Sequence, residues 1–396
     1  MTGDEFICWD EGGKSCSALW HSENGIKAHK RVLLADDTIS ADQAFRLACE
    51  GTALLWRGDF QNARQLMQAL MRRSDKPSKK SKRMDKRSDV SSDLAPQKSP
   101  LDLFNQHRLM QSRRARILGM LLIQCNPDHT ISLRRAPDVA LACLEAYGPA
   151  SESYVISLRE LLGVLSAHEW RKKGLPVLVD SSREPVIVHP HYGVFSPIRG
   201  EYLELVCNAP LPSALETKSV AFDIGVGTGV LSVILAMRRV QKIIATDLDE
   251  RALICATDNI HHLNLHHQVQ VIKANLFPEG KAALAVCNPP WLPARPSSRL
   301  EHAVYDPDNQ MLKGFLGNLK NHLFDQGEGW LILSDLAEHL GMRTRKQLLD
   351  WIEQAGLQVL SRIDTKPKHG KAFDETDPLY FARSAETTSL WRLSIR

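Results

Sequence analysis

Hydrophobic residues in the second half of the chain follow a pattern that switches between two periods. Short apolar runs alternate with longer segments in which apolar residues lie three or four positions apart. This alternation predicts strands connected by helices, and hence a mostly parallel sheet with helices on both faces. The expected strands are residues 220–224, 242–246, 269–273, 283–287, 329–334, 357–363 and 389–395, and the expected helices are 229 onward, 249–263, 310–323 and 344–355. Because no helix is expected between the last two strands, the last strand should run antiparallel.

The first half of the chain shows mainly the helical period. Ser40 and Gln43 form a capping box ahead of apolar residues at helical spacing, which predicts a helix from Ser40 to about Trp56. Gly58 and Asp59 interrupt this pattern, and a second helix is expected to follow them. Further helices are expected at about 137–147 and 158–172, with room for short strands around Leu121 and Ile131. The expected picture is a mainly helical accessory region in front of the α/β sheet.

These patterns divide the chain into four parts. The expected parts are a helical N-terminal region (1–73), a disordered basic linker (74–100), a helical accessory region (101–175) and an α/β domain (176–396) that opens with a hairpin. The linker has almost no apolar residues, so it cannot bury enough surface to offset the entropy of ordering. Between Arg72 and Lys98 the chain has ten basic and four acidic residues. This segment is either a solubilising tether or an arm that contacts nucleic-acid phosphates.

Composition restricts the class of protein. Of the 396 residues 43% are hydrophobic, and no run of 18 apolar residues is present that would span a membrane. The N-terminus carries acidic residues where a secretory signal would carry basic ones. The eight cysteines are scattered, and the four histidines between positions 261 and 267 lack acidic or thiolate partners nearby. We therefore expect a globular, cytoplasmic protein with reduced cysteines and no metal site.

A glycine-rich turn follows the first strand of the α/β domain. It reads Asp223-x-Gly225-x-Gly227-x-Gly229. Glycine is needed where a chain turns sharply and a ligand approaches the backbone. The next strand ends at Asp247, whose carboxylate can accept both hydroxyls of a ribose. The arrangement fits a cofactor that contains adenosine, and a dinucleotide is disfavoured because its fingerprint has glycine or alanine where this chain has Val230.

The fourth strand of the α/β domain leads into a second motif. It reads Asn288-Pro289-Pro290-Trp291. The carboxyl ends of parallel strands meet at one edge of a sheet, so this motif should lie beside the glycine turn. The side-chain oxygen of Asn288 and the main-chain carbonyl of Pro289 can accept the two hydrogens of a flat NH2 group. The prolines restrict the loop, and Trp291 can stack on a planar acceptor, so these four residues are the expected catalytic group.

The glycine turn resembles the first motif of the class I S-adenosylmethionine-dependent methyltransferases, and the resemblance extends over about residues 190–396. It implies a Rossmann-like, seven-stranded methyltransferase sheet and S-adenosyl-L-methionine as the cofactor. In this family the turn passes the methionine end of the cofactor, which Asp223 would help to position, while Asp247 would hold the ribose. An acidic residue after the third strand commonly binds the adenine amine, and Asn275 stands there in this chain.

Asn-Pro-Pro followed by an aromatic residue resembles the small-domain (MTS) branch of that family. Members of this branch methylate glutamine side chains of release factors and a ribosomal protein, or exocyclic amines of guanine or adenine in RNA. The segment 193–201 resembles the strand and loop that precede the glycine turn in both groups. The resemblance implies an N-methyltransferase of the translation machinery, to which the N-terminal region would present the acceptor.

Several acceptors remain open for such an enzyme. A glutamine of a ribosomal protein or release factor is favoured, and a base amine of rRNA or tRNA is the alternative. Contact with nucleic acid through the basic segment 72–98 would suit an acceptor that carries RNA. A small-molecule acceptor is a third possibility, and a non-catalytic RNA-binding assembly factor with the same fold is a fourth.

Overall fold

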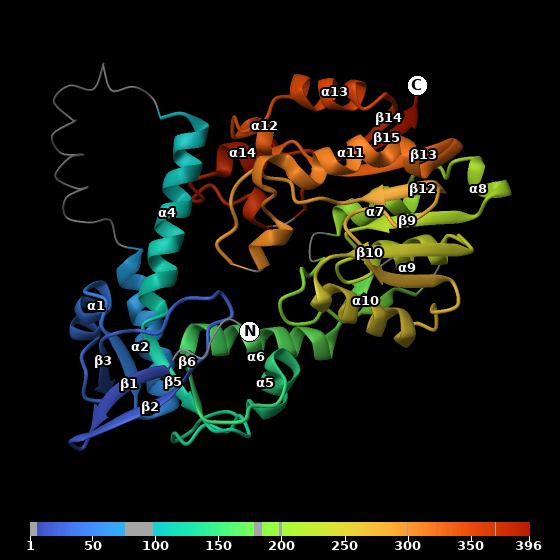
Figure 1. The fold of residues 1–396 in the computed structure, drawn as a ribbon. Helices are drawn as coiled ribbons and strands as arrows, with labels where there is room; N and C mark the ends of the chain where they lie inside the picture. Colours follow the sequence, from blue (N-terminus) through green and yellow to red (C-terminus); the bar gives the residue numbers. More distant parts are fainter. Residues whose placement is uncertain (1–5, 76–97, 178–183, 198–199, 299, 369) are drawn as a thin grey trace, which may run out of the picture. The chain divides into compact units, whose positions relative to one another are not determined.

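The computed structural model describes residues 6–75, 98–177, 184–197, 200–298, 300–368 and 370–396. The chain divides into two compact units, residues 1–168 and 169–396. Each unit contains its own large sheet (Figure 1). Most of the linker expected at 74–100 lies outside the described residues, so its predicted disorder stays a prediction. All eight cysteines are free thiols.

The N-terminal unit is an α/β unit with a six-stranded mixed sheet in the order β1-β2-β6-β5-β4-β3. Its strands are β1 (Phe6–Glu11), β2 (Lys14–Trp20), β3 (Val32–Ala35), β4 (Ala53–Trp56), β5 (Leu121–Cys125) and β6 (Tyr154–Ser157). Its helices are α1 (Ala41–Cys49), α2 (Phe60–Ser74), α4 (Pro100–Leu118) and α5 (Ala140–Tyr147), and α6 (Leu158–Lys173) begins within it. Strands β3, β4 and β5 run parallel, whereas β1 and β6 pair antiparallel with β2 and β5 respectively.

The expectation of a mainly helical N-terminal region is therefore wrong. The first helix begins as predicted, because the Ser40 side chain accepts a hydrogen bond from the Gln43 amide at 3.2 Å. It ends at Cys49, and Gly51 turns the chain with a φ of +82° into β4. All four residues of β4 are buried, so the strand lacks the polar alternation that marks a half-exposed strand. Strands β5 and β6 join the same sheet, so the expected division between residues 1–73 and 101–175 is also wrong.

The C-terminal unit contains the elements expected for the α/β domain. A short antiparallel hairpin, β7 (Leu175–Val177) with β8 (Val186–Val188), leads into it as predicted. The sheet strands are β9 (Val220–Ile224), β10 (Lys242–Asp247), β11 (Val269–Lys273), β12 (Ala282–Cys287), β13 (Leu323–Ser334), β14 (Leu357–Thr365) and β15 (Thr388–Ile395). The helices are α7 (Glu201–Asn208), α8 (Ala214–Thr217), α9 (Val230–Met237), α10 (Glu250–His262), α11 (Gln310–His322), α12 (Leu336–His339), α13 (Arg345–Gln354) and α14 (Tyr380–Ala385).

The seven strands lie in the order β11-β10-β9-β12-β13-β15-β14, and β15 is antiparallel to both of its neighbours. The two faces of the sheet bury separate apolar cores. Buried residues of α7, α9 and α10 pack on one face, and buried residues of α11 and α13 pack on the other (Figure 1). Side chains of a strand alternate between the faces, so Ala221 belongs to the first core and Phe222 to the second. The sheet is therefore covered on both sides, as its apolar strands predict.

Two details of this sheet differ from the expectation. Strand β13 begins at Leu323 instead of Gly329, and its first residues pass through Gln326, which has a φ of +64°. Between β14 and β15 the chain forms the short helix α14, so the expected absence of a helix there is wrong. The last strand still pairs antiparallel, because this connection returns the chain to the edge of the sheet at which β14 ends.

Candidate active site

The register of the central strands brings the two motifs together. Ile224, the last residue of β9, pairs with Cys287, the last residue of β12. On its other side Ile224 pairs with Thr246 of β10. The strand order reverses at β9, and open α/β sheets bind ligands outside the carboxyl ends of the strands at such a point. The glycine turn and the Asn-Pro-Pro-Trp loop thus leave the sheet side by side.

The glycine turn has the backbone geometry that its sequence predicts. Gly225, Gly227 and Gly229 have φ values of +80°, +53° and +82°, in the region that favours glycine. The Gly225 amide donates to the Thr246 carbonyl at 2.9 Å, which fixes the turn to β10. A Cβ on Gly227 would meet no atom within 4 Å, so open space lies over the turn at this residue. A ligand can therefore approach the backbone there.

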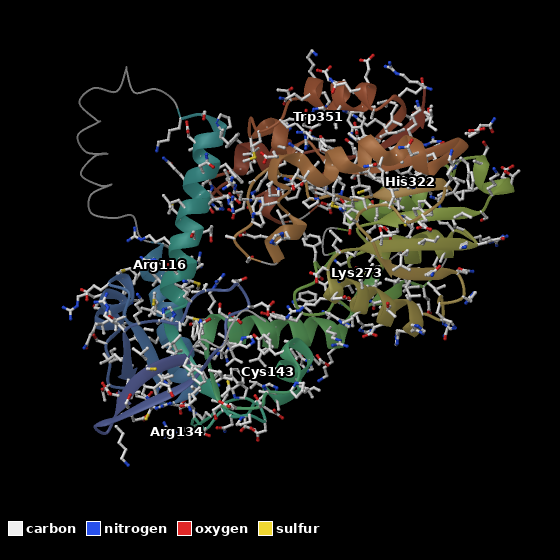
Figure 2. All side chains as sticks on the ribbon, in the orientation of Figure 1. Arg116, Arg134, Cys143, Lys273, His322 and Trp351 are labelled. Atoms are coloured by element: carbon white, nitrogen blue, oxygen red, sulfur yellow. The ribbon has the colours of Figure 1, made fainter. Side chains whose placement is uncertain are left out.

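Asp247 ties the end of β10 to the glycine turn. Its Oδ2 accepts a hydrogen bond from the Gly227 amide at 3.2 Å, and its Oδ1 accepts from the Asp249 amide at 3.0 Å. The N-cap of α10 is Asp249, whose Oδ1 accepts from the Arg251 amide, so Asp247 is not merely a helix cap. A carboxylate oxygen can accept more than one hydrogen bond, so half-buried Asp247 retains capacity for ligand hydroxyls. Lys273, labelled in Figure 2, is the last residue of β11 and lies opposite Asp247 in the backbone pairing of β10 with β11.

Asp223 is fully buried directly before the glycine turn. Its Oδ2 accepts a hydrogen bond from the Ser232 hydroxyl at 2.6 Å, whereas its Oδ1 has no hydrogen-bond partner. Burial raises the pKa of Asp223 to about 7, and the charge of Asp247 acts in the same direction. A buried carboxylate oxygen without a partner is costly, and a cationic ligand donor would satisfy it. Together with the open space over Gly227, this oxygen fits the ammonium end of S-adenosylmethionine.

Asn275 lies in the connection that follows β11, and its side chain is exposed. Two hydrogen bonds hold this connection against the end of β10. The Ala274 amide donates to the Asp247 carbonyl at 3.2 Å, and the Thr246 hydroxyl donates to the Leu276 carbonyl. The structure thus brings the backbone around Asn275 to the same sheet edge as Asp247. The expected contact of its amide with adenine stays a prediction.

The Asn-Pro-Pro-Trp loop contains a hydrogen bond that the sequence did not predict. The indole Nε1 of Trp291 donates to Oδ1 of Asn288 at 2.9 Å. This bond fixes which way the amide of Asn288 points, and the oxygen can accept one further hydrogen. Pro289 is buried, and half-buried Trp291 packs against both apolar cores of the unit. Trp291 therefore orients the side-chain amide of Asn288, in addition to its expected stacking on an acceptor.

The loop after Trp291 is anchored by Asp306, which the sequence analysis missed. The Asp306 amide donates to the Leu292 carbonyl at 2.8 Å. Its carboxylate, only 4% exposed, accepts from the amides of Met311 and Leu312 at 3.0 and 3.1 Å. An aspartate shortly before a run of helical spacing is an N-terminal signal that could have identified it. Asp306 thus connects the loop after Trp291 to α11, whose Met311 would contact a Cβ placed on Gly225.

Metal ligands and membrane spans were searched for separately. Within the described part of the chain, no group of three or more His, Cys, Asp or Glu side chains could hold a metal ion. His261 and His266 instead stack their rings at a centroid distance of 5.0 Å. None of the helices in the described ranges is long and apolar enough to cross a membrane.

Comparison with known proteins shows that the central part of this site is similar to a methyltransferase family. Residues 205–289 match the family model of ribosomal protein L11 methyltransferase (PrmA). The match begins within α7, includes the glycine turn and Asp247, and ends at Pro289, before Trp291. The similarity confirms the expected class of domain, a S-adenosylmethionine-dependent methyltransferase domain. The assignment to the branch with Asn-Pro-Pro-Trp stays a prediction.

Two curated relatives have the same description. The ribosomal protein L11 methyltransferase of Alkaliphilus metalliredigens is 25% identical over 127 residues, which cover 28% of this chain and 39% of the relative. That of Thermoanaerobacter pseudethanolicus is 33% identical over 85 residues, covering 21% of this chain and 27% of the relative. The chain therefore spans less than half the length of these relatives.

Solved structures give weaker similarities. A ribosomal protein L11 methylase from Lactobacillus delbrueckii subsp. bulgaricus has a TM-score of 0.36 and 14% identity, covering 56% of this chain and 90% of that one. Geranyl diphosphate C-methyltransferase from Streptomyces coelicolor A3(2), in complex with Mg2+, geranyl diphosphate and S-adenosyl-L-homocysteine, has a TM-score of 0.33 and 13% identity, covering 45% and 72%.

Proposed function

We propose that this chain is a S-adenosylmethionine-dependent N-methyltransferase that acts on a planar nitrogen of a macromolecule in the translation machinery. The observation that carries the proposal is the pairing of Ile224 with Cys287, after which the glycine turn and Asn288 leave adjacent strands. A cofactor over the turn would then lie next to an acceptor held by Asn288. Because its acceptor would belong to the translation machinery, the enzyme would act in the cytoplasm.

The cofactor would be held by groups at the ends of three neighbouring strands. Asp223 would receive its ammonium end, Asp247 its ribose hydroxyls and Asn275 its adenine amine. The open space over Gly227 would leave room for its chain. When bound, the cofactor supplies a methyl group on a sulfonium, which is already electrophilic. The protein therefore needs neither a strong base nor a metal ion for the transfer, and positioning contributes most of the barrier reduction.

The acceptor nitrogen would be prepared by Asn288 and Pro289. Its lone pair is delocalised into a carbonyl or an aromatic ring, so the free group is a poor nucleophile. Two acceptors aimed at its hydrogens, the Asn288 Oδ1 and the Pro289 carbonyl, favour a pyramidal nitrogen with its lone pair directed at the methyl. The hydrogen bond from Trp291 to Asn288 supports this role, because it fixes the amide before the acceptor arrives.

A protein glutamine is the favoured acceptor. The similarity of residues 205–289 to proteins described as ribosomal protein L11 methyltransferases supports a ribosomal protein as the macromolecule. The choice of glutamine within it rests on the resemblance of the Asn288-Pro289-Pro290-Trp291 motif. An amine of an RNA base is the second candidate, supported by the basic segment 72–98 and by exposed Arg113 and Arg116 on α4. A non-catalytic assembly factor is disfavoured, because such a protein has no need of Asp223, Asp247 and Asn288 at one sheet edge.

A labelling experiment tests this proposal. The purified chain is incubated with methyl-labelled S-adenosylmethionine and a lysate from a strain that lacks the gene. We expect the label to enter a macromolecule from which RNase does not release it and protease does. Release by RNase alone would select the RNA alternative, and absence of label from every macromolecule would contradict the proposal.

A further inference from the structure

Glu201 is a buried carboxylate at the start of a helix, where glutamate is usually solvated. It is the first residue of α7, and it is only 3% exposed. Its Oε1 has no hydrogen-bond partner. The hydroxyl oxygen of Ser196, in the segment that leads to α7, is likewise buried without a partner. This segment therefore encloses polar atoms that the described protein leaves unsatisfied.

Glu201 and Asp223 lie around the same side chain. Burial raises the pKa of the Tyr202 phenol, and the negative charges of Asp223 and Glu201 raise it further. Both carboxylates are thus close enough to Tyr202 to act on it. Helix α7, which carries Glu201, also packs against α9, which begins directly after the glycine turn. Arg238, directly after α9, donates to the carbonyls of Val206 and Ala209 at the end of α7, so the two helices run in the same direction and both begin at the end of the unit where the glycine turn lies. Two unsatisfied carboxylate oxygens, Oε1 of Glu201 and Oδ1 of Asp223, therefore lie near this end, and the two residues are called the acidic pair.

Among the residues that the structure describes, no cation accompanies the acidic pair, although buried carboxylates ordinarily require one. Neither Glu201 nor Asp223 forms an ion pair with any residue that the structure describes. Leaving two carboxylates buried and unpaired costs several kcal/mol, unless one is protonated or a ligand supplies positive charge. An ammonium group has three donors, enough for both oxygens and one further acceptor. The pair is thus suited to a primary ammonium on a ligand that enters beside the glycine turn.

We propose that Glu201 is a second cofactor-binding carboxylate, whose Oε1 accepts a hydrogen bond from the same ammonium group that Asp223 receives. This inference rests on the proposed function, because it assigns a role within the same cofactor site. This role explains why the glutamate at the start of α7 is buried away from water.

The test compares two ligands that differ at this end. S-adenosylhomocysteine contains the ammonium group but has no sulfonium, and 5′-methylthioadenosine has neither the ammonium nor the carboxylate. We expect Glu201→Gln to weaken binding of S-adenosylhomocysteine by roughly 10- to 100-fold, the usual effect of losing a charged hydrogen bond. Binding of 5′-methylthioadenosine should be unchanged. The matched control is Glu204→Gln, one turn along α7, where the exposed carboxylate pairs with Lys368 at 2.7 Å; it should bind both ligands like the wild type.

Two outcomes would overturn the inference. Unchanged affinity of Glu201→Gln for S-adenosylhomocysteine would show that Glu201 does not contact the ammonium group. Equal loss of affinity for both ligands would indicate a structural role only. If Glu201→Gln does not fold, Glu201→Asp decides the question. Its shorter side chain should still reduce the affinity for S-adenosylhomocysteine and leave that for 5′-methylthioadenosine unchanged. Failure of the wild type to bind either ligand would instead contradict the proposed function, so the two failures are distinguishable.

Discussion

Replacing Asn288 with alanine is expected to reduce methyl transfer by roughly 100- to 1,000-fold, the effect seen when one positioning group is removed from an active site. The variant loses the oxygen that would draw the acceptor nitrogen toward a pyramidal geometry. Its cofactor affinity should be unchanged, because Asn288 belongs to the acceptor side of the sheet edge. Turnover is measured as label incorporated into the macromolecular acceptor, and cofactor affinity is measured by calorimetry.

The control for this variant is Asn318→Ala. Asn318 is an exposed asparagine of α11 whose side chain donates to the Gly314 carbonyl, and its loss should not alter turnover. Because Asn288→Ala also removes the acceptor of the Trp291 indole, Trp291→Phe is needed to separate the two effects. Trp291→Phe should lose less activity, since Asn288 remains. Full turnover by Asn288→Ala would contradict the proposed role of Asn288 in holding the acceptor nitrogen.

Replacing Asp223 with asparagine is expected to have two opposite effects, loss of cofactor affinity and gain of stability. The neutral amide cannot offer a charged partner to the ammonium, so affinity for S-adenosylhomocysteine should fall by roughly 10- to 100-fold. In the ligand-free protein the same change removes a buried charge whose Oδ1 has no hydrogen-bond partner. The thermal midpoint should therefore rise at pH 8, by about 2–4 °C for each kcal/mol gained.

The sign of the pH dependence follows from the pKa of Asp223. Burial raises it from 3.8 to about 7 in the folded protein. The contribution of this group to stability is therefore fully present below pH 3.8 and lost as the pH rises to about 7, a loss of at most about 4 kcal/mol. The stability difference between Asp223→Asn and the wild type should accordingly be small at pH 4 and largest above pH 7.

Ligand binding should show the complementary trend in the wild type. An ammonium selects the ionised carboxylate, so affinity for S-adenosylhomocysteine should increase up to about pH 7 and level off above it. Ser232→Ala is the matched control, because it removes the hydrogen bond to Asp223 but retains the carboxylate, and it should still bind the ligand. Wild-type affinity in Asp223→Asn at pH 8 would contradict this account.

The fold of the C-terminal unit could be predicted from the sequence because its signals are local. Strands β9 and β11 have the predicted bounds, since each is a short apolar run between polar or glycine-rich turns. The positive φ values of Gly225, Gly227 and Gly229 follow from a residue type that alone adopts them without strain. Adjacency of Asn288 to this turn then follows from parallel pairing of β9 with β12.

The N-terminal unit could not be predicted in the same way. Strand β4 has four buried residues, and a strand covered on both faces has the same apolar composition as a buried turn of helix. This segment is a strand because it pairs with β3 and with β5, and β5 lies beyond the basic segment 72–98 in the chain. Such contacts between distant parts of the chain leave no periodic trace in either part.

The missed features of the site have the same origin. The hydrogen bond from Trp291 to Asn288 depends on the shape of a loop, and the burial of Glu201 depends on the packing of α7 against α9. Asn288, Trp291 and Glu201 all lie in motifs that the sequence shows, but their roles depend on which atoms have hydrogen-bond partners after folding. Sequence motifs could therefore locate the site, whereas the distribution of charge within it required the structure.

Calorimetric titration of the wild-type chain with S-adenosylhomocysteine tests the central claim most directly, because the glycine turn, Asp223 and Asp247 all serve one cofactor site. The account predicts saturable binding of one ligand per chain in the micromolar range, stronger at pH 8 than at pH 5. Absence of a binding signal at millimolar ligand would contradict it.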